Sequence, residues 1–403
     1  MLGFENRIKV IRERFQDQSN PTLSIYCDVN PAKPENTNRA WITRIKTTLR
    51  ELSNSQPADK NLISLCDEVV KLLETDRPSA RTLVLFASKA NLDLMLERLD
   101  LQIELPVVDL ASGHIEVHYG KPYLNPLLFA IDEYERTGIL HLAGKGWKFF
   151  EVFLGEIREE EQVFSEIDDK EWQELHGAAQ KVNEMFEKRG ARPGGLYDEM
   201  SPKERASSRI DTLLHKQYKR LSYLLDKAVD SLAIERIVLM GEKWQVNHFE
   251  NYMSRGSRNR IVARIPRPAN STALTRKDFE EYIFPVLEKV EREAEMELLE
   301  QVKQKGGLWG MASVLDALQY ARVNLWILPW SLREQAWYCK EQKFIAATEE
   351  MAKIVCKQPE RVALRNYVWE LAAEFGARLE FVRGDAEEKL IKEMGGMAAL
   401  LRW

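Results

Sequence analysis

A stretch of the chain between residues 188 and 209 combines two adjacent glycines with a local excess of positive charge. Residues 193–197 read Pro-Gly-Gly-Leu-Tyr, and paired glycines let other groups approach the backbone closely. The basic side chains in and around this stretch are Lys188, Arg189, Arg192, Lys203, Arg205 and Arg209. Such a cluster could hold the phosphates of an RNA. An ordinary turn followed by a solvated helix face fits the same residues, so both interpretations stay open.

Other residues whose side chains could bind a ligand or react are scattered along the sequence. A second basic stretch, open to the same two interpretations, contains Arg255, Arg258, Arg260 and Arg264. Four cysteines are too few and too far apart for a disulfide framework, and we interpret them as reduced thiols. They are Cys27, Cys66, Cys339 and Cys356. His114 and His118 share a face of an expected strand without a third ligand nearby, so we expect solvated or capping histidines and no metal site.

Composition limits the classes of function. Charged residues make up 30% and hydrophobic residues 44% of the 403, and no apolar run approaches the roughly 20 residues of a membrane-spanning helix. The N-terminus lacks the apolar core of a secretory signal, so we expect a soluble, cytoplasmic protein without a membrane partner. A net charge of −5 argues against coating DNA or RNA through bulk charge, so any RNA contact must be local. No cofactor-binding or hydrolase motif is found, and no cofactor is expected.

The elements around the two glycines indicate an α/β domain. We expect strands at 137–143 and 147–157 joined by a turn at 144–146, a long amphipathic helix from residue 207, and strands at 234–240 and 260–265. Residues 189–205 lack periodicity and contain several glycines and prolines, which indicates a long exposed loop. The polar side of the long helix carries Lys216, Lys219, Arg220 and Lys227.

The flanking segments also alternate helix and strand. Before the central segment we expect strands at 23–29 and 81–87 and helices at 39–52 and 62–73. After it we expect a helix capped by Thr275, kinked at Pro285 and ended by Gly306-Gly307, then helices at 311–320 and 362–375 and strands at 324–329 and 378–382. Proline- and glycine-rich stretches at 119–126 and 266–271 suggest boundaries. The prediction is an α/β protein of three domains, 1–128, 129–270 and 271–403.

Six stretches together resemble the bacterial members of the archaeo-eukaryotic release factor superfamily, relatives of class-1 release factors and of Pelota. They are Leu-Ser-Ile-Tyr-Cys-Asp at 23–28, Thr-Leu-Val-Leu-Phe-Ala-Ser at 82–88, Gly-Lys-Pro-Tyr-Leu-Asn-Pro-Leu-Leu at 120–128, Phe-Phe-Glu-Val-Phe-Leu-Gly-Glu-Ile at 149–157, Ala-Leu-Gln-Tyr-Ala-Arg-Val at 317–323 and Gly-Gly-Met-Ala-Ala-Leu-Leu-Arg at 395–402. They run in the same order as in that family. The resemblance implies an RNase H-like central domain and a C-terminal domain like ribosomal protein L7Ae.

The resemblance also implies a site. Active relatives carry a Gly-Gly-Gln loop, in which an amide side chain and a backbone N–H can place water and stabilise an oxyanion. The corresponding residues here are Gly194, Gly195 and Leu196, so the glutamine is missing and hydrolysis is in doubt. The Asn-Ile-Lys-Ser tetrapeptide used in stop-codon reading is also absent. Cys339 and Cys356 fall where some relatives have zinc-ribbon cysteine pairs, but each stands alone, which favours a metal-free insertion.

Three hypotheses of function follow. The first is a factor that binds the ribosome or tRNA in termination, rescue or quality control, with weak or absent hydrolysis and an unidentified GTPase partner. The second is an active peptidyl-tRNA hydrolase in which Tyr197 or Glu199 positions the water. The third is a metal-dependent nuclease, which is disfavoured because Glu151 and Glu156 would point to opposite faces of a regular strand.

Overall fold

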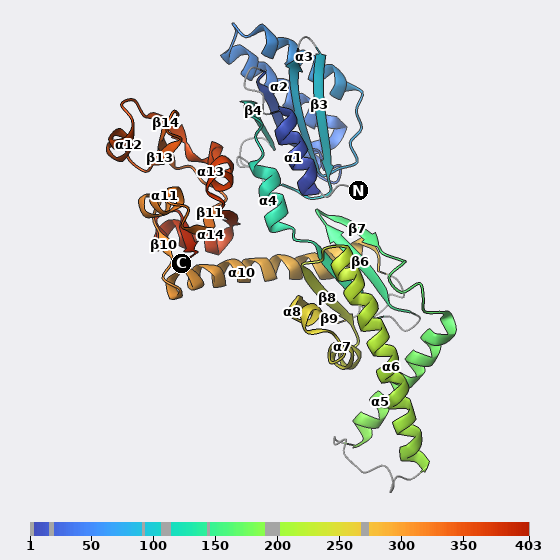
Figure 1. Ribbon diagram of the computed structural model, residues 1–403. Coiled ribbons are helices and arrows are strands. Elements are labelled where there is room, and N and C mark those ends of the chain that lie inside the picture. Colours follow the sequence, from blue (N-terminus) through green and yellow to red (C-terminus); the bar gives the residue numbers. More distant parts are fainter. Residues whose placement is uncertain are drawn as a thin grey trace. The chain divides into compact units, whose positions relative to one another are not determined.

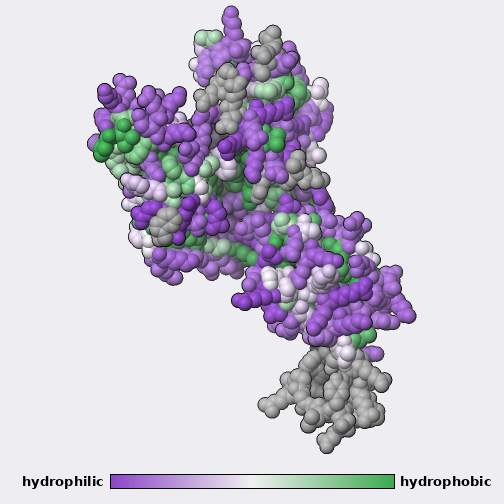
Figure 2. All heavy atoms as spheres, viewed as in Figure 1, coloured by the Kyte–Doolittle hydropathy of each residue, from purple (hydrophilic) through white to green (hydrophobic). Residues whose placement is uncertain are grey.

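The computed structural model describes residues 4–15, 20–90, 93–105, 114–142, 146–189, 202–266 and 274–402, and gives only the backbone of residues 5, 90, 182–183, 185–189 and 202–211. The chain divides into two compact units, whose elements are labelled in Figure 1. The first contains residues 1–134 and 291–403, and the second contains residues 135–290. Within the described residues, no helix combines the length and apolar character that a membrane crossing requires. Hydrophilic residues cover most of the surface visible in Figure 2, and apolar residues show in scattered patches.

The N-terminal part of the first unit is an antiparallel sheet with helices on both faces. Its elements are α1 (Phe4–Phe15), β1 (Thr22–Asp28), η1 (Pro34–Arg39), α2 (Ala40–Ser55), α3 (Lys60–Glu74), β2 (Thr82–Ala90), β3 (Asp93–Leu101), β4 (Ile115–Gly120) and α4 (Asn125–Glu133). The strand order is β3-β2-β1-β4. Alternate residues of β1, including Leu23 and Ile25, face α2 and α3, whereas Tyr26 packs on Phe86, which contacts Phe15 of α1. The predicted strands and helices of this part are confirmed, with shifts of a few residues at their ends.

The C-terminal part of the first unit contains two further sheets. Its elements are α10 (Phe284–Gln304), β10 (Leu308–Trp309), α11 (Met311–Gln319), β11 (Val323–Pro329), β12 (Gln335–Cys339), β13 (Phe344–Ala346), α12 (Glu349–Val355), β14 (Glu360–Ala363), η4 (Leu364–Asn366), α13 (Val368–Phe375), β15 (Arg378–Val382), α14 (Gly384–Met394) and β16 (Ala398–Leu401). The larger sheet has the order β10-β16-β11-β15, and the smaller has the order β13-β12-β14. Helices α11 and α13 cover one face of the larger sheet, and α10 and α14 cover the other.

Two predictions for this part are wrong. A helix was expected from residue 362, but residues 360–363 form the edge strand β14, and α13 begins only at Val368. Cys339 and Cys356, interpreted from the sequence as reduced thiols, are joined in a disulfide. The cysteines lie 17 residues apart in sequence, but the packing of α12 against β12 brings their Cα atoms to 5.9 Å, which a disulfide can span. Cys27 and Cys66 are free, as expected. Both are buried, and burial raises the pKa of Cys27 to about 12.

The second unit is built on a mixed five-stranded sheet. Its elements are β5 (Thr137–His141), β6 (Lys148–Phe153), β7 (Glu156–Glu159), α5 (Asp169–Arg189), α6 (Pro202–Ser231), β8 (Arg236–Gly241), α7 (Lys243–Glu250), α8 (Arg255–Asn259), β9 (Ile261–Pro266), α9 (Arg276–Asp278) and η3 (Phe279–Ile283), followed by the start of α10. The strand order is β7-β6-β5-β8-β9. β5 pairs antiparallel with β6 and parallel with β8, and β9 continues parallel to β8.

Side chains of the sheet alternate between two cores. Leu140, Phe149 and Leu239 pack against α5, α6 and α7 on one face. Their neighbours Phe150 and Val238 pack on the other face against η3 and the start of α10. This alternation follows from the two-residue repeat of a strand and explains why the central strands consist of consecutive apolar residues.

The helix and strand predictions for the second unit are partly confirmed. The Thr275 cap is present as a capping box with Asp278, and the π-type turn η3 lies just before Pro285. The expected strand 147–157 is wrong, because a turn with positive φ at Leu154 and Gly155 divides it into the hairpin β6–β7. The long helix begins at residue 202 rather than 207, and α5 was not predicted.

Candidate functional site

The predicted site residues that the structure describes lie on a helical hairpin formed by α5 and α6. The two helices pack together, and their parts nearest the sheet contribute Trp172, Leu175, Tyr218 and Leu221 to the core. Arg220 of α6 donates to a carboxylate oxygen of Glu171 at 3.0 Å, which ties the two helices together. In Figure 1 the ends of α5 and α6 that border residues 190–201 lie away from the five-stranded sheet. The sheet therefore holds the base of the hairpin, and the predicted residues that the structure describes lie at its far end.

The structure places only some of the predicted site residues. Gly194, Gly195, Leu196 and Arg192 lie outside the described residues. The remaining five lie on helices for which the backbone alone is described there. Lys188 and Arg189 end α5, and Lys203, Arg205 and Arg209 lie in the first turns of α6. Pro202 is the first residue of α6. The backbone N–H at this position makes no helical hydrogen bond, so proline is tolerated there.

The second basic stretch is mostly engaged within its own unit. Arg258 donates to the backbone carbonyl oxygens of Asn251 and Met253, each at 3.1 Å. Arg264 donates two hydrogen bonds to the carboxylate of Glu250, at 2.6 and 2.8 Å. This bidentate contact lowers the pKa of the Glu250 carboxyl. These two arginines support the fold, so the structural interpretation is the better one for them.

The two glutamates considered for a nuclease lie together instead of on opposite faces. Because the chain turns between β6 and β7, Glu151 and Glu156 each approach the guanidinium of Arg158 at 4.0 Å. Arg136 also contacts Glu151, so arginines supply the positive charge that a divalent cation would bring. Nowhere in the described ranges do three or more His, Cys, Asp or Glu side chains form a group that could hold a metal ion.

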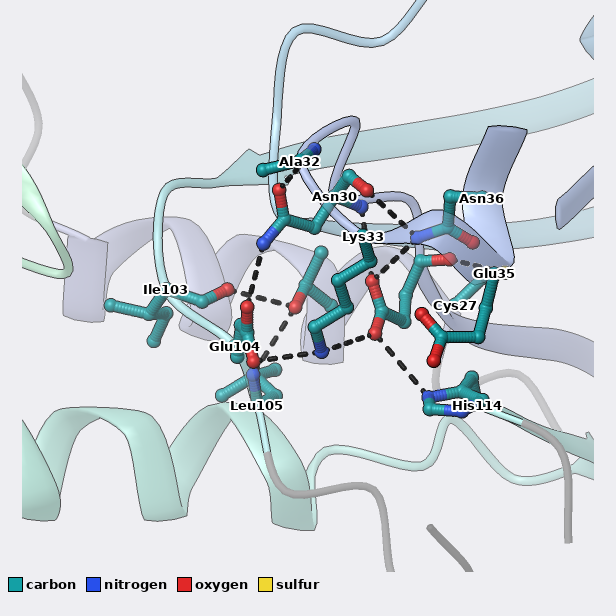
Figure 3. Close-up of polar contacts among 12 residues, drawn as sticks. Cys27, Asn30, Ala32, Lys33, Glu35, Asn36, Ile103, Glu104, Leu105 and His114 are labelled. Carbon is teal, nitrogen blue, oxygen red and sulfur yellow. Dashed lines mark hydrogen bonds and ion pairs between the residues drawn. The ribbon is translucent and has the colours of Figure 1, made fainter. Parts of the chain in front are cut away.

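The first unit contains a partly buried polar network that the sequence analysis missed (Figure 3). Its centre is Asp28, at the end of β1. One carboxylate oxygen accepts from the backbone N–H of Asn30 and from the side chain of Asn36, both at 3.0 Å. The other oxygen accepts from Lys33 at 2.7 Å and lies 3.4 Å from Nδ1 of His114. The carboxylate is therefore surrounded by donors on both oxygens.

The network continues into a second carboxylate. Lys33 also contacts Glu104 at 2.8 Å, and the amide of Asn30 donates to Glu104 at 2.6 Å. Burial alone would raise the pKa of Asp28, but the hydrogen bonds from Lys33, Asn30 and Asn36 outweigh it and hold the pKa below its usual value. Asp28 is therefore a fully engaged anion that fixes the loop after β1, not a free base.

The two histidines of the sequence analysis also have defined contacts. His114 faces Asp28, and His118 stacks on Tyr123 with a centroid distance of 3.8 Å while its Nε2 lies 3.0 Å from Glu116. Both rings keep part of their exposure to solvent, and each also faces a carboxylate, which the sequence analysis did not predict.

Replacing Asp28 by asparagine is expected to lower the free energy of unfolding by about 1–3 kcal/mol at pH 7. The amide keeps the shape, but its NH2 group faces donors that need an acceptor. The lowered pKa means that the wild-type contribution is complete above the pKa of the unfolded chain and is lost as the pH falls through the folded value. Urea denaturation measures the difference, with Asp67→Asn on the exposed side of α3 as control. Equal stability of the two variants would contradict the prediction.

Comparison with known proteins places this arrangement in a class. Residues 122–281 match the sequence model of the bacterial archaeo-eukaryotic release factor family 10. The match covers all the sheet strands of the second unit and the whole helical hairpin. Over these residues the chain is release-factor-like, as the resemblance inferred from its sequence indicated. The particular branch that its central segment matches is bacterial family 10.

Solved structures of release factors and their relatives are similar to the chain at low identity. An archaeal translation termination factor, aRF1, is 14% identical, with 99% of this chain and 98% of that chain covered and a TM-score of 0.24. Dom34 of S. cerevisiae, a translation termination-like factor involved in RNA quality control that interacts with Hbs1, is 9% identical over 80% of each chain, with a TM-score of 0.37. Pelota of Archaeoglobus fulgidus is 12% identical over 81% of each chain, with a TM-score of 0.28. No curated protein matches the chain.

Proposed function

We propose that this protein binds the ribosome or tRNA and acts in translation termination, rescue or quality control. The observation that carries the proposal is the family match across the helical hairpin, whose adjoining helix ends bear Lys188, Arg189, Lys203 and Arg205. A cationic hairpin held at one end by a rigid sheet is suited to contacting RNA phosphates. Leu196 stands where a catalytic glutamine is expected, so we assign the hairpin a binding role without glutamine-dependent hydrolysis.

The domain assignments belong to the same proposal. The mixed sheet of the second unit has an antiparallel meander β5-β6-β7, with β8 parallel to β5 and β9 parallel to β8. This sheet supports an RNase H-like domain within 129–270. The sheet β10-β16-β11-β15 with helices on both faces supports an L7Ae-like domain within 271–403. A cytoplasmic location and a GTPase partner belong to the same proposed function.

The test is co-sedimentation of the full-length protein with large ribosomal subunits. The wild type is expected in the ribosomal pellet. Replacing Arg189, Arg192 and Arg205 together by alanine removes three phosphate contacts. The loss should shift the protein to the supernatant and reduce the slope of log affinity against log salt by about 3.

The matched control removes the same charge elsewhere. Arg50, Arg77 and Arg361 are exposed arginines on other parts of the chain, and their triple replacement by alanine should leave pelleting unchanged. A wild type that stays in the supernatant at low salt would refute the proposed function. Equal losses in the two triple variants would refute the role of the hairpin.

A further inference from the structure

One face of α6 carries cations and an aromatic ring that the fold does not use. Lys216, Lys219, Tyr223 and Lys227 are all exposed, and their spacing of three, four and four residues places them on one side of the helix. We call these four residues the α6 lysine face. The opposite side of α6 is buried in the core of the second unit. At 1.5 Å per residue the face extends about 16 Å along the helix.

The lysines of this face differ from the other charged groups of α6. Arg220 is paired with Glu171, and Asp226 accepts from Ser254 at 2.8 Å. Across the part of the chain that the structure describes, no carboxylate lies within ion-pair distance of the three lysines. Lys148 of the same unit, by contrast, contacts Glu159 at 2.7 Å. In a chain with a net charge of −5, three neighbouring lysines without a carboxylate form a local site for an anion.

Tyr223 gives the face a second kind of chemistry. Tyr223 is 58% exposed, so its ring contributes little to the fold. The Nζ atom of Lys227 lies 4.6 Å from the ring centroid, so a cation contacts one side of an exposed π-system. Proteins that bind single-stranded nucleic acids combine cations with exposed aromatic rings. The phosphates contact the cations, and a base stacks on the ring.

We propose that the α6 lysine face binds a single-stranded segment of RNA, with its phosphates on Lys216, Lys219 and Lys227 and one unpaired base stacked on Tyr223. A duplex hides its base faces and would use the lysines alone. The proposal rests on the proposed function for the source of the RNA. It concerns a surface on the middle of the hairpin, separate from the residues that border its end.

The test measures RNA binding by the full-length protein without ribosomes. The probe is a fluorescein-labelled 12-nucleotide oligouridylate, followed by fluorescence anisotropy at several salt concentrations. The triple variant Lys216→Ala, Lys219→Ala, Lys227→Ala should raise Kd by at least about tenfold and reduce the salt slope by about 2. Tyr223→Ala should raise Kd by about tenfold, whereas Tyr223→Phe should bind like the wild type because the ring still stacks.

The controls separate this surface from general charge and from the proposed function. Lys71, Lys340 and Lys357 are exposed lysines elsewhere, and their triple replacement by alanine should leave Kd unchanged. Labelled heparin should lose affinity with the lysine variant but not with Tyr223→Ala. A wild type that does not bind the RNA, equal losses in the two lysine triples, or no effect of Tyr223→Ala would overturn the proposal. None of these outcomes affects pelleting through the hairpin end, and loss of pelleting by the wild type would leave the RNA result intact.

Discussion

Replacing Phe129 by alanine is expected to lower the free energy of unfolding by about 3–5 kcal/mol. Phe129 lies on α4 and is fully buried. Its ring centroid lies 4.1 Å from that of Trp330 and 6.3 Å from that of Phe381, both in the C-terminal part of the first unit. The truncation therefore leaves a cavity between segments that are 201 and 252 residues apart in sequence, where partial collapse cannot restore the contacts.

The expected loss follows from position rather than from residue type. Phe375, at the end of α13, belongs to the same core but is only partly buried, so Phe375→Ala is expected to cost about 1–2 kcal/mol. Urea denaturation followed by tryptophan fluorescence measures both variants. Similar losses for the two variants would show that α4 does not pack on this core. A larger loss for Phe129→Ala would support the docking of α4 that the structure shows.

Much of the fold could be predicted from local patterns. Apolar runs rich in β-forming residues predict the strands β1 and β2. An apolar stripe with lysines on the opposite side predicts α6. The Thr275 cap could be predicted because a capping box needs only residues three apart. These signals are short in range, and sequence reasoning finds them for that reason.

The elements that were missed depend on contacts with distant residues. α5 contains many charged residues, which obscure its apolar stripe in the sequence. The structure shows that Trp172 and Leu175 belong to this stripe, because they pack in the same core as α6. The hairpin β6–β7 depends on a turn in which Leu154 adopts a positive φ, which a sequence pattern does not favour for leucine. Within the described residues, β14 is an edge strand that pairs only with β12, 20 or more residues earlier.

The candidate sites divide in the same way. The basic residues around the hairpin end could be predicted because they cluster in sequence. The Asp28 network could not, since Glu104 lies 74 residues from its partner Asn30 and His114 lies still further along the chain. The disulfide joining Cys339 to Cys356 was likewise hidden by the intervening strand β13 and helix α12.

Glu295 on α10 is a buried carboxyl that should make stability depend on pH. Its side chain is fully buried, with Oε1 2.9 Å from Nη1 of Arg292 and the backbone N–H of Arg383 at 3.3 Å. Arg292 also contacts Glu133, so one guanidinium serves two buried carboxyls. Burial raises the pKa of Glu295 to about 8, opposed by Arg292 and the Arg383 N–H and reinforced by Glu133 and Glu291. The folded protein therefore holds a proton here at pH 7.

Replacing Glu295 by glutamine is expected to remove a pH dependence of stability. Between the carboxyl pKa of the unfolded chain, about 4.3, and the folded value of about 8, the folded state binds more protons. The wild type therefore loses stability as the pH rises through this window and levels off above it. The amide cannot ionise, so Glu295→Gln should gain stability over the wild type by a few kcal/mol at pH 9 compared with pH 5.

Glu300, one turn further along α10, provides the control for this prediction. It is exposed, and its hydrogen bond with Lys389 lowers its pKa, so it stays ionised from pH 5 to pH 9. Glu300→Gln should therefore change stability by the same amount at both pH values. Denaturation of the wild type and of both variants at pH 5, 7 and 9 separates the two cases. A Glu295→Gln variant whose difference from the wild type is the same at every pH would mean that the buried carboxyl is ionised throughout, held by Arg292 against its burial.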